Sequence, residues 1–487
     1  MQSKRDQVQA HMFLMGRLTT SMLRSDPDAP ESPQGRTNRG VAMGVLFAVL
    51  LSAGAFVFGM LSPGGTDSWR TSNALVVDQD TGSRYLYLDG RLRPVRNYTS
   101  ARLLVGAKLA TTTVHTSSLA GVPRGAPVGI PGAPDTIPPA DRLDSGPWQI
   151  CSGGASVSSR GRPGTTVAVG TAADGAGLGP QEALLIRAPD ASQFLVWHGS
   201  RLRLDVGHGA AESLGYETAT PLAVTDAFLN SLPLGPDLAP PEVPGEGSPG
   251  PRLDDRPTTV GQVVRVAAPG SATRYYLVRR DGLTPMTATE AALALGSPDS
   301  ADSKKVVDIG ASALAGHLAP QTHEGTLPLP SSPPRLQQPG KNQTACVRVQ
   351  PSDQGPRLRV SLLELDALGP VAQPPLEGMT PACFPADRIM VPAGRGMLVH
   401  ALGAGGGQVG DTVYLVTDTG MKYRVPTAQA LESLGYSASH PAALPSTLLS
   451  LLPTGPDLAP TAAAAGKAVT TAQRCAPLPE PGHTKSA

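Results

Sequence analysis

The longest apolar stretch of the chain is Val41–Leu61, VAMGVLFAVLLSAGAFVFGML, which contains no charged residue. A helix rises about 1.5 Å per residue, so a helix over this stretch would span roughly 30 Å, the thickness of the hydrocarbon core of a bilayer. No second stretch approaches this length. The pattern therefore predicts one transmembrane helix near the N-terminus, with residues 62–487 beyond it.

A cleaved signal peptide is the alternative interpretation of this stretch. Signal peptides have a short charged segment and an apolar core of roughly 7–15 residues. Here residues 1–40 precede an apolar stretch of full spanning length, although small residues at 52–55 resemble a cleavage site. Six Lys or Arg residues precede the span, whereas Arg70 is the only one among the first twenty residues after it. By the positive-inside rule the N-terminus is cytoplasmic and the larger part is exported.

The residues before the span form two segments. In Ser3–Arg24 apolar residues recur at the spacing of one helix face, with Ser3 and Asp6 as an N-cap and an acidic first turn. That face consists of Val8, Met12, Met15, Leu18 (or Thr19) and Met22. Residues 25–40 contain three prolines and are expected to form an extended linker. Because an isolated helix is marginal in water, we expect the face to dock on a partner protein; a helix on the membrane surface and disorder are the alternatives.

Internal repeats are the second strong signal in the exported part. Glu212–Pro240 aligns without gaps on Glu432–Pro460, a shift of 220, with sixteen of 29 positions identical. Each copy follows an alternating apolar stretch, a turn with glycine and a second short stretch, which is the pattern of a β-hairpin. Weaker copies of this hairpin are Tyr85–Val95 and Tyr275–Met286, and Ala/Leu-rich stretches after the hairpins predict short helices.

The two strong copies end in a shared Pro-x-Gly-Pro-Asp-Leu-Ala-Pro element. Its prolines fix the backbone and remove hydrogen-bond donors, so it cannot continue a helix or a central strand. We expect this element to end each repeat and redirect the chain. Peptide binding is the alternative role.

All four cysteines lie beyond the span. They form no C-x-x-C pair and match no zinc spacing, so an even number in an oxidising compartment indicates two disulfides. Two non-repeat pieces lie between the repeats; one carries Cys151, and the other carries Cys346 and Cys383. The simplest topology joins the pieces into one central domain stapled by Cys151–Cys346. Cys383 and Cys475 would then tie the C-terminal tail to the body.

The predicted fold class is α+β: a cytoplasmic amphipathic helix, one transmembrane helix, and an elongated exported domain with a β-rich central core flanked by four small repeats. The predicted segments are 1–40, cytoplasmic helix and linker; 41–61, transmembrane helix; 69–115, repeat 1; 116–189, central domain, first part; 190–240, repeat 2; 259–315, repeat 3; 316–395, central domain, second part; 396–460, repeat 4; and 461–487, a Pro-rich tail.

Catalytic motifs are missing from the sequence. There is no G-x-x-x-x-G-K-[ST] phosphate loop, no G-x-S-x-G and no H-E-x-x-H. The glycine-rich Gly403–Gly410 lacks the lysine of such a loop and is expected to be a mobile loop between strands. The histidines are scattered, and the net charge of +1 gives no reason to expect nucleic acid. We therefore predict no catalytic, cofactor-binding or metal-ligating residue, and no cofactor.

The opening segment from Ser3 to Gly40, directly before a single span, closely resembles the EccB family of actinobacterial type VII (ESX) secretion systems. The repeats ending in LPxGPDLAP and the spacing of Cys151 and Cys346 are similar to that family too, and the resemblance extends to about Pro460. It implies a structural subunit of the inner-membrane core complex, with a periplasmic or cell-envelope domain. The implied partners are the EccC ATPase, EccD, EccE, the mycosin protease and further copies of the chain itself.

Some members of that family are described as ATPases, but this sequence has no Walker motif to support the description. An ATP hydrolase or a cell-wall hydrolase is therefore the enzymatic alternative to a scaffold. A cell-wall-binding module is the third candidate. With only 4% aromatic residues, the chain offers few side chains for stacking on glycans.

The charge asymmetry around the span makes a topological prediction. A reporter active only outside the cytoplasm should give signal when fused at residue 70 or beyond, and none when fused at residue 38. Reporter activity in intact cells is the measurement. The reverse pattern would overturn the orientation and, with it, the compartment of the large domain.

Overall fold

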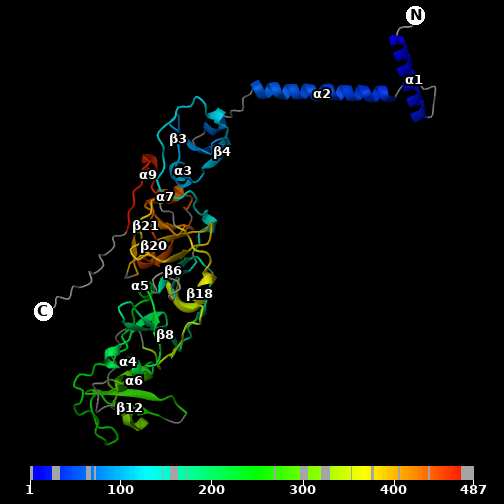
Figure 1. Cartoon of the computed structure of the whole chain (residues 1–487). Coiled ribbons are helices and arrows are strands. Elements are labelled where there is room, and N and C mark those ends of the chain that lie inside the picture. The colour runs from blue at the N-terminus through cyan, green and yellow to red at the C-terminus, as the bar shows by residue number, and fades with distance from the viewer. Residues whose placement is uncertain are drawn as a thin grey trace, which may run out of the picture. The chain divides into compact units, whose positions relative to one another are not determined.

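The computed structural model describes residues 4–24, 33–61, 67–70, 73–144, 146–153, 163–171, 173–267, 270–296, 305–319, 329–352, 354–373, 378–403, 406–436 and 439–472. Two compact units divide the chain: one is drawn from 1–92 with 110–125, and the other from 93–109 with 126–487. Several small sheets and a few helices make up these units (Figure 1), so the predicted α+β class is confirmed.

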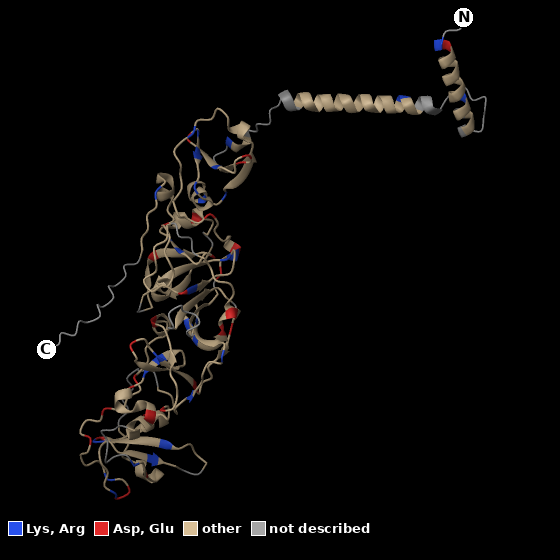
Figure 2. Ribbon diagram, in the orientation of Figure 1, with Lys and Arg blue, Asp and Glu red and all other residues tan. Residues whose placement is uncertain are grey.

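Two helices open the chain. The first, α1 (Lys4–Arg24), covers the predicted amphipathic segment; its expected N-cap, Ser3, lies outside the described residues. The second, α2 (Pro33–Leu61), contains Thr37–Phe58, a stretch long and apolar enough to cross a bilayer. Figure 2 shows basic residues on α2 only toward its N-terminal end.

The extended linker predicted for residues 25–40 is wrong over its second half, because α2 begins at Pro33. Proline is well tolerated in the first helical turn, where its missing N–H has no intrahelical partner and its fixed φ suits the helix. The polar residues that follow then continue the helix into the apolar stretch. Residues 25–32 lie outside the described residues.

The first unit contains a sheet that we call sheet 1, with strand order β3-β2-β1-β4. Strand β1 pairs antiparallel with β2 and parallel with β4, and the hairpin expected at Tyr85–Val95 is β2 with β3. Asp89 and Gly90 have positive φ and form the tight turn between them. The strands are β1 (Ala74–Asp78), β2 (Arg84–Leu88), β3 (Arg91–Pro94) and β4 (Ala110–Val114), preceded by the 3₁₀ turn η1 (Asp67–Arg70).

Three further sheets in the second unit have the same strand order as sheet 1. In each, a strand pairs antiparallel with the next and parallel with the fourth. Sheet 2 consists of β8 (Glu182–Arg187), β9 (Gln193–Trp197), β10 (Ser200–Arg203) and β11 (Leu222–Ala223), with a fifth strand, β16 (Arg335–Leu336), paired parallel with β8; sheet 3 of β12 (Val263–Val266), β13 (Arg274–Arg279), β14 (Gly282–Met286) and β15 (Val307–Asp308); and sheet 4 of β20 (Met397–Leu402), β21 (Gln408–Val416), β22 (Lys422–Val425) and β23 (Ala442–Pro445).

A short helix connects the third and fourth strands of each sheet. These helices are α3 (Tyr98–Val105), α4 (Ala210–Ser213), α6 (Ala288–Gly296) and α7 (Ala428–Ser433). Because β8 belongs to sheet 2, this sheet begins at Glu182, and the expected boundary at residue 190 is too late. The strand was missed because its run of apolar residues, Ala183–Ile186, lacks the polar alternation that marked the other hairpins.

After each fourth strand comes a short helical segment: η2 (Thr116–Leu119), α5 (Asp226–Asn230), η5 (Ala311–Leu314) and α8 (Ser446–Leu449). The chain then returns beside the third strand of the same sheet. In sheets 2 and 4 this returning segment is the shared Pro-rich element, where Arg201 N–H donates to Pro233 O at 2.9 Å and Lys422 N–H to Pro453 O at 3.0 Å. The element is thus an edge segment, a position in which prolines are tolerated.

The two non-repeat pieces share one sheet, which we call the central sheet, with strand order β19-β6-β5-β17-β18-β7. Its middle strands pair antiparallel with Cys151 opposite Cys346, and a disulfide joins these residues. The strands are β5 (Trp148–Gly153), β6 (Gly164–Val169), β7 (Ala176–Gly177), β17 (Gln343–Gln350), β18 (Arg357–Glu364) and β19 (Arg388–Met390).

One hydrophobic core joins the central sheet to sheets 2 and 4, through side chains such as Trp148, Ile186 and Leu452. The other face of sheet 2 packs with Leu293 of α6, and that of sheet 4 with Leu103 of α3. The remaining elements are η3 (Ala140–Arg142), η4 (Val206–His208), η6 (Leu365–Leu368) and α9 (Pro460–Ala465).

The disulfide between β5 and β17 should contribute much of the stability of the second unit. It closes a loop with a sequence separation of 195, and the chain-entropy model gives roughly 5 kcal/mol for such a loop. We expect Cys151→Ser or Cys346→Ser to lower the free energy of unfolding by several kcal/mol in denaturant titrations. Non-reducing peptide mapping should recover the Cys151–Cys346 pair, and two free thiols in protein from undamaged cells would contradict the stapled sheet.

Candidate functional site

The exposed surface of α1 is the first candidate for an interaction site. The predicted face, Val8, Met12, Met15, Leu18 and Met22, is between 51% and 80% exposed. Phe13 and Leu14 are equally exposed, so the apolar surface is wider than the predicted face. Burial of a large apolar side chain is worth about 1.5–3 kcal/mol, so covering this helix offers a large gain in free energy.

The cysteines form the second group of predicted residues. Cys151 and Cys346 are completely buried and pack with Ala168, Leu363 and Met390. Cys383 is also disulfide-bonded, and its expected partner, Cys475, lies outside the described residues. Backbone bonds between Thr380 and Thr454 hold the segment before Cys383 against the end of sheet 4.

Two buried tyrosines attach sheets 2 and 4 to the chain segments that enter the central sheet. The hydroxyl of Tyr216 donates to Pro334 O at 2.7 Å, and that of Tyr436 donates to Pro138 O at 2.6 Å. Burial raises the pKa of both phenols, so both hydroxyls stay protonated and able to donate. Each tyrosine ends the Glu-Ser-Leu-Gly-Tyr stretch of its repeat, but sequence reasoning found the repeat without finding this role.

Two cations bind the ends of short helices at equivalent places in sheets 2 and 4. The buried ammonium of Lys422 donates to Leu452 O at 2.9 Å and to Leu449 O, at the C-terminal end of α8. In the same way, Arg201 donates to Leu229 O at 2.9 Å near the end of α5. Carbonyl groups at a helix C-terminus favour a cation. Burial lowers the pKa of Lys422 to about 8.

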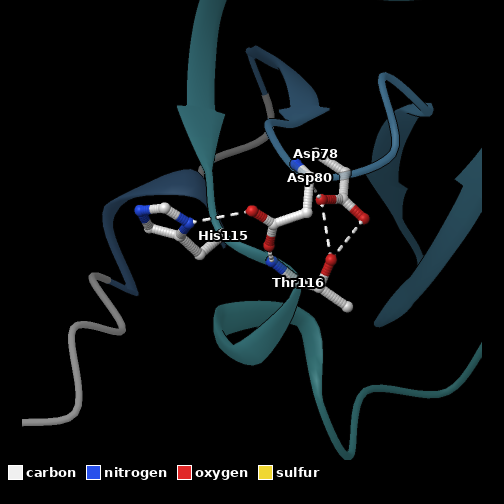
Figure 3. A network of polar contacts seen from close by, with 4 residues as sticks. All are labelled: Asp78, Asp80, His115 and Thr116. Atoms are coloured by element: carbon white, nitrogen blue, oxygen red, sulfur yellow. Dashed lines mark hydrogen bonds and ion pairs between the residues drawn. The ribbon is translucent and has the colours of Figure 1, made fainter.

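A polar network in sheet 1 links the ends of β1 and β4 (Figure 3). The hydroxyl of Thr116 donates to the Asp78 carboxylate at 2.8 Å, and its N–H donates to Asp80 at 2.9 Å. His115 Nδ1 lies 3.2 Å from Asp80 Oδ1, with both side chains about half exposed. The network holds the parallel β1–β4 pair together; ion pairs of such exposure contribute little by themselves.

The hydrogen bonds of this network also lower the pKa of both carboxyl groups. Burial alone would raise the pKa of Asp78, but the hydrogen bonds from Thr116, Thr81 and the Asp80 N–H outweigh it. For Asp80 the largest cause is the hydrogen bond from the Thr116 N–H, followed by the contact with His115. Both groups are therefore ionised in ordinary buffers, which suits them to accept these bonds.

The described part of the chain contains no group of three or more His, Cys, Asp or Glu side chains that could hold a metal ion. Gly403 N–H donates to Gly407 O at 2.9 Å in the connection between β20 and β21, whereas Gln408–Gly410 already belong to β21; residues 404–405 lie outside the described residues. The polar side chains described above thus hold segments of the chain together. Among the described residues, most of the exposed large apolar side chains lie on α1 and α2.

The sequence matches the family model described as type VII secretion system ESX-1, transport TM domain B, over residues 1–471. It is 31% identical over 480 residues to the ESX-3 secretion system ATPase EccB3 of Mycolicibacterium smegmatis, covering 93% of this chain and 89% of that relative. It is 28% identical over 470 residues to the ESX-1 secretion system ATPase EccB1 of Mycobacterium tuberculosis, covering 94% and 93%.

Solved structures give the same result. A chain in the structure of an intact ESX-5 inner membrane complex matches with a TM-score of 0.66 at 24% identity, covering 97% of this chain and 96% of that one. The structure of an EccB3 dimer from the ESX-3 core complex matches with a TM-score of 0.65 at 25% identity, covering 80% and 100%. The matched proteins are all components of type VII secretion machines. This chain belongs to the EccB family, and the resemblance found in the sequence is confirmed.

The buried Lys422 predicts a pH dependence of stability. Its pKa falls from 10.5 to about 8 on folding, so between these values the folded chain binds fewer protons than the unfolded chain. Linkage then makes the free energy of unfolding rise with pH through this window, by up to roughly 3 kcal/mol. The cost of burying the ammonium is fully present below the window and is relieved above it.

Lys422→Met removes this titration. The stability of the wild type relative to the variant should therefore increase from pH 8 to pH 10.5 in denaturant titrations. Lys341→Met, at an exposed lysine, is the matched control and should leave the pH dependence unchanged. A constant difference between wild type and Lys422→Met would show that the lysine is not buried as a cation.

Proposed function

We propose that this chain is a structural, membrane-anchored subunit of a type VII (ESX) secretion core complex, in which it joins the inner-membrane part of the export machine to the periplasmic part. The observation that carries the proposal is the match, over nearly the whole chain, to EccB subunits and to chains of ESX inner membrane assemblies. The candidate span in α2 and the sheets that follow it in the chain suit this role.

The orientation follows from charge and from cysteine chemistry. Basic residues precede the span, which supports a cytoplasmic α1 with the sheets on the other side of the membrane. A buried disulfide in the central sheet agrees with an oxidising compartment. The sheets therefore form the periplasmic, or cell-envelope, portion of the protein.

The partners are assigned by surface. In this proposal the cytoplasmic helix α1 docks through Val8, Met12, Met15, Leu18 and Met22 on the partners that the family resemblance implies: the EccC ATPase, EccD and EccE. The exported body contacts further copies of the chain and the mycosin protease. The EccB3 dimer among the matched structures supports self-association.

Sheets 1–4 are four copies of one repeat, and along the chain they form two consecutive halves, each with two repeats and one of the two cysteines of the Cys151–Cys346 pair. Their common strand order and the equivalent hydrogen bonds of Tyr216 and Tyr436 support this arrangement. The central sheet has the same two-part organisation: β5 is next to β6 from the first half, β17 is next to β18 from the second, and β5 and β17 are neighbours. A second covalent tie, between Cys383 and Cys475, would secure the C-terminal tail.

ATP hydrolysis is the competing function, because the matched relatives carry the name ATPase. We expect no turnover above a buffer control when the purified chain is incubated with ATP and magnesium and released phosphate is measured, because the sequence offers no phosphate loop. Turnover that follows the purest fractions of the protein would favour the enzyme over the scaffold.

The docking role of α1 predicts the effect of a paired substitution. Met12→Asp with Met15→Asp places two carboxylates on the proposed contact, where an unpaired charge is costly to bury, and removes about 1.5–3 kcal/mol for each apolar side chain. We expect the subunit to be lost from complexes purified from membranes, while the exported body keeps its thermal transition.

The matched control places two carboxylates on the same helix outside the predicted face: Gln9→Asp with Ala10→Asp, both at exposed positions. This variant should assemble like the wild type. Intact assembly of the Met12/Met15 variant would refute the docking helix, and equal loss of both variants would point to a general effect of negative charge.

A further inference from the structure

Sheet 4 binds a peptide segment of its own chain. Asp457, in the Pro-rich element, donates its N–H to Val469 O at 2.7 Å. Its carboxylate accepts the N–H of Thr471 at 3.0 Å and the hydroxyl of the same residue at 2.7 Å. Arg424 reaches the same carboxylate at 3.1 Å, and the carboxylate is buried. One aspartate and one arginine thus hold an extended segment that presents a threonine.

Sheet 2 carries the same pair at the equivalent place. Leu238 N–H donates to Arg203 O at 2.7 Å, as Leu458 N–H donates to Arg424 O at 2.8 Å. Asp237 precedes Leu238 in the same Pro-rich element in which Asp457 precedes Leu458. The backbone therefore places Asp237 and Arg203 as it places their counterparts in sheet 4.

A hydroxyl side chain is also common to the two places. In sheet 4 the guanidinium of Arg424 lies 3.5 Å from Thr412 Oγ1. Arg424 pairs with Tyr414 and Arg203 pairs with Phe194, so the residues two positions earlier, Thr412 and Ser192, correspond to each other.

The place in sheet 2 is an accessible cavity of about 330 Å³, lined by Ser192, Gln193, Arg203, Asp205 and Asp237 among others. Asp237 is exposed and makes no hydrogen bond to any residue that the structure describes. The chain runs on from Pro240 toward sheet 3 instead of turning back as it does after Pro460. The same recognition groups are therefore available to another chain.

We propose that the cavity at Asp237 and Arg203 binds an extended peptide segment of a partner protein that carries a threonine or serine. The Asp237 N–H donates to a carbonyl of the peptide, and its carboxylate accepts both the N–H and the hydroxyl of one peptide residue. This mode combines strand addition at an edge with a charge-assisted hydrogen bond. The site goes beyond the scaffold function proposed above and does not depend on it.

The geometry also predicts the preference of the site. A residue without a hydroxyl loses one of the two bonds to the carboxylate, so valine in place of threonine should bind less well. The prolines around Asp237 fix the backbone, so the site loses little conformational entropy when it binds a peptide. Because the site is shallow and exposed, we expect a dissociation constant on the order of 0.1–1 mM.

A peptide with the sequence of residues 466–473, GKAVTTAQ, is the probe, because it contains the segment that sheet 4 holds. The fluorescein-labelled peptide is titrated with the full-length protein in detergent, and binding is followed by fluorescence anisotropy. We expect saturable binding that Asp237→Asn weakens by about tenfold or more. A peptide with valine in place of the threonine that corresponds to Thr471 should be weakened to a similar degree.

Glu217→Gln is the matched control, since it removes an exposed carboxylate of the same repeat that does not line the cavity, and it should leave binding of the added peptide unchanged. A benzophenone group on the peptide should cross-link to residues near Ser192 or Asp237. Absence of saturable binding at millimolar peptide, binding unaffected by Asp237→Asn, or cross-links confined to the surroundings of Asp457 would each overturn the proposal. Self-association that is lost in Asp237→Asn would identify the occupant as a second copy and overturn the assignment to a different partner.

Discussion

The pairing of β5 with β17 is the constraint on which the rest of the second unit depends. These strands come from pieces of the chain separated by about two hundred residues, yet they lie at the middle of one sheet with Cys151 opposite Cys346. The core on one face of this sheet is shared with sheets 2 and 4. Loss of the pairing would therefore expose this apolar core and detach sheets 2 and 4 from the central sheet.

One strand order recurs in sheets 1–4, although each sheet packs against different segments of the chain. Each of sheets 1–4 is closed by a returning segment or by side chains that tie its first and fourth strands, such as Thr116 with Asp78. Sheets 2 and 4 share polar groups with defined partners: Arg201 and Lys422 bind helix ends, and Tyr216 and Tyr436 bind the segments that enter the central sheet. A buried polar group with defined partners fixes one arrangement among several that apolar packing alone would allow.

Much of this organisation was predictable, because periodicity and repetition record local structure. Val41–Leu61 predicts a span, the hairpin patterns predict strand pairs, and Met12 and Met15 predict an amphipathic helix. Strand β8 and the helical start at Pro33 were missed, since a fully apolar strand lacks alternation and proline marks both linkers and first turns. The partners of Tyr216 and Lys422 could not be predicted from sequence, because they are brought together only by packing between distant segments.

The wide separation of the central strands also has a consequence for biogenesis. The chain is made from its N-terminus, so β5 and β6 exist long before β17 can pair with them, and until then one edge of β5 offers its N–H and C=O groups to any neighbouring strand. Contacts of such long sequence separation form slowly. The thiol of Cys151 has no Cys346 to pair with throughout this interval, so the disulfide of the central sheet forms only after β17 has been made.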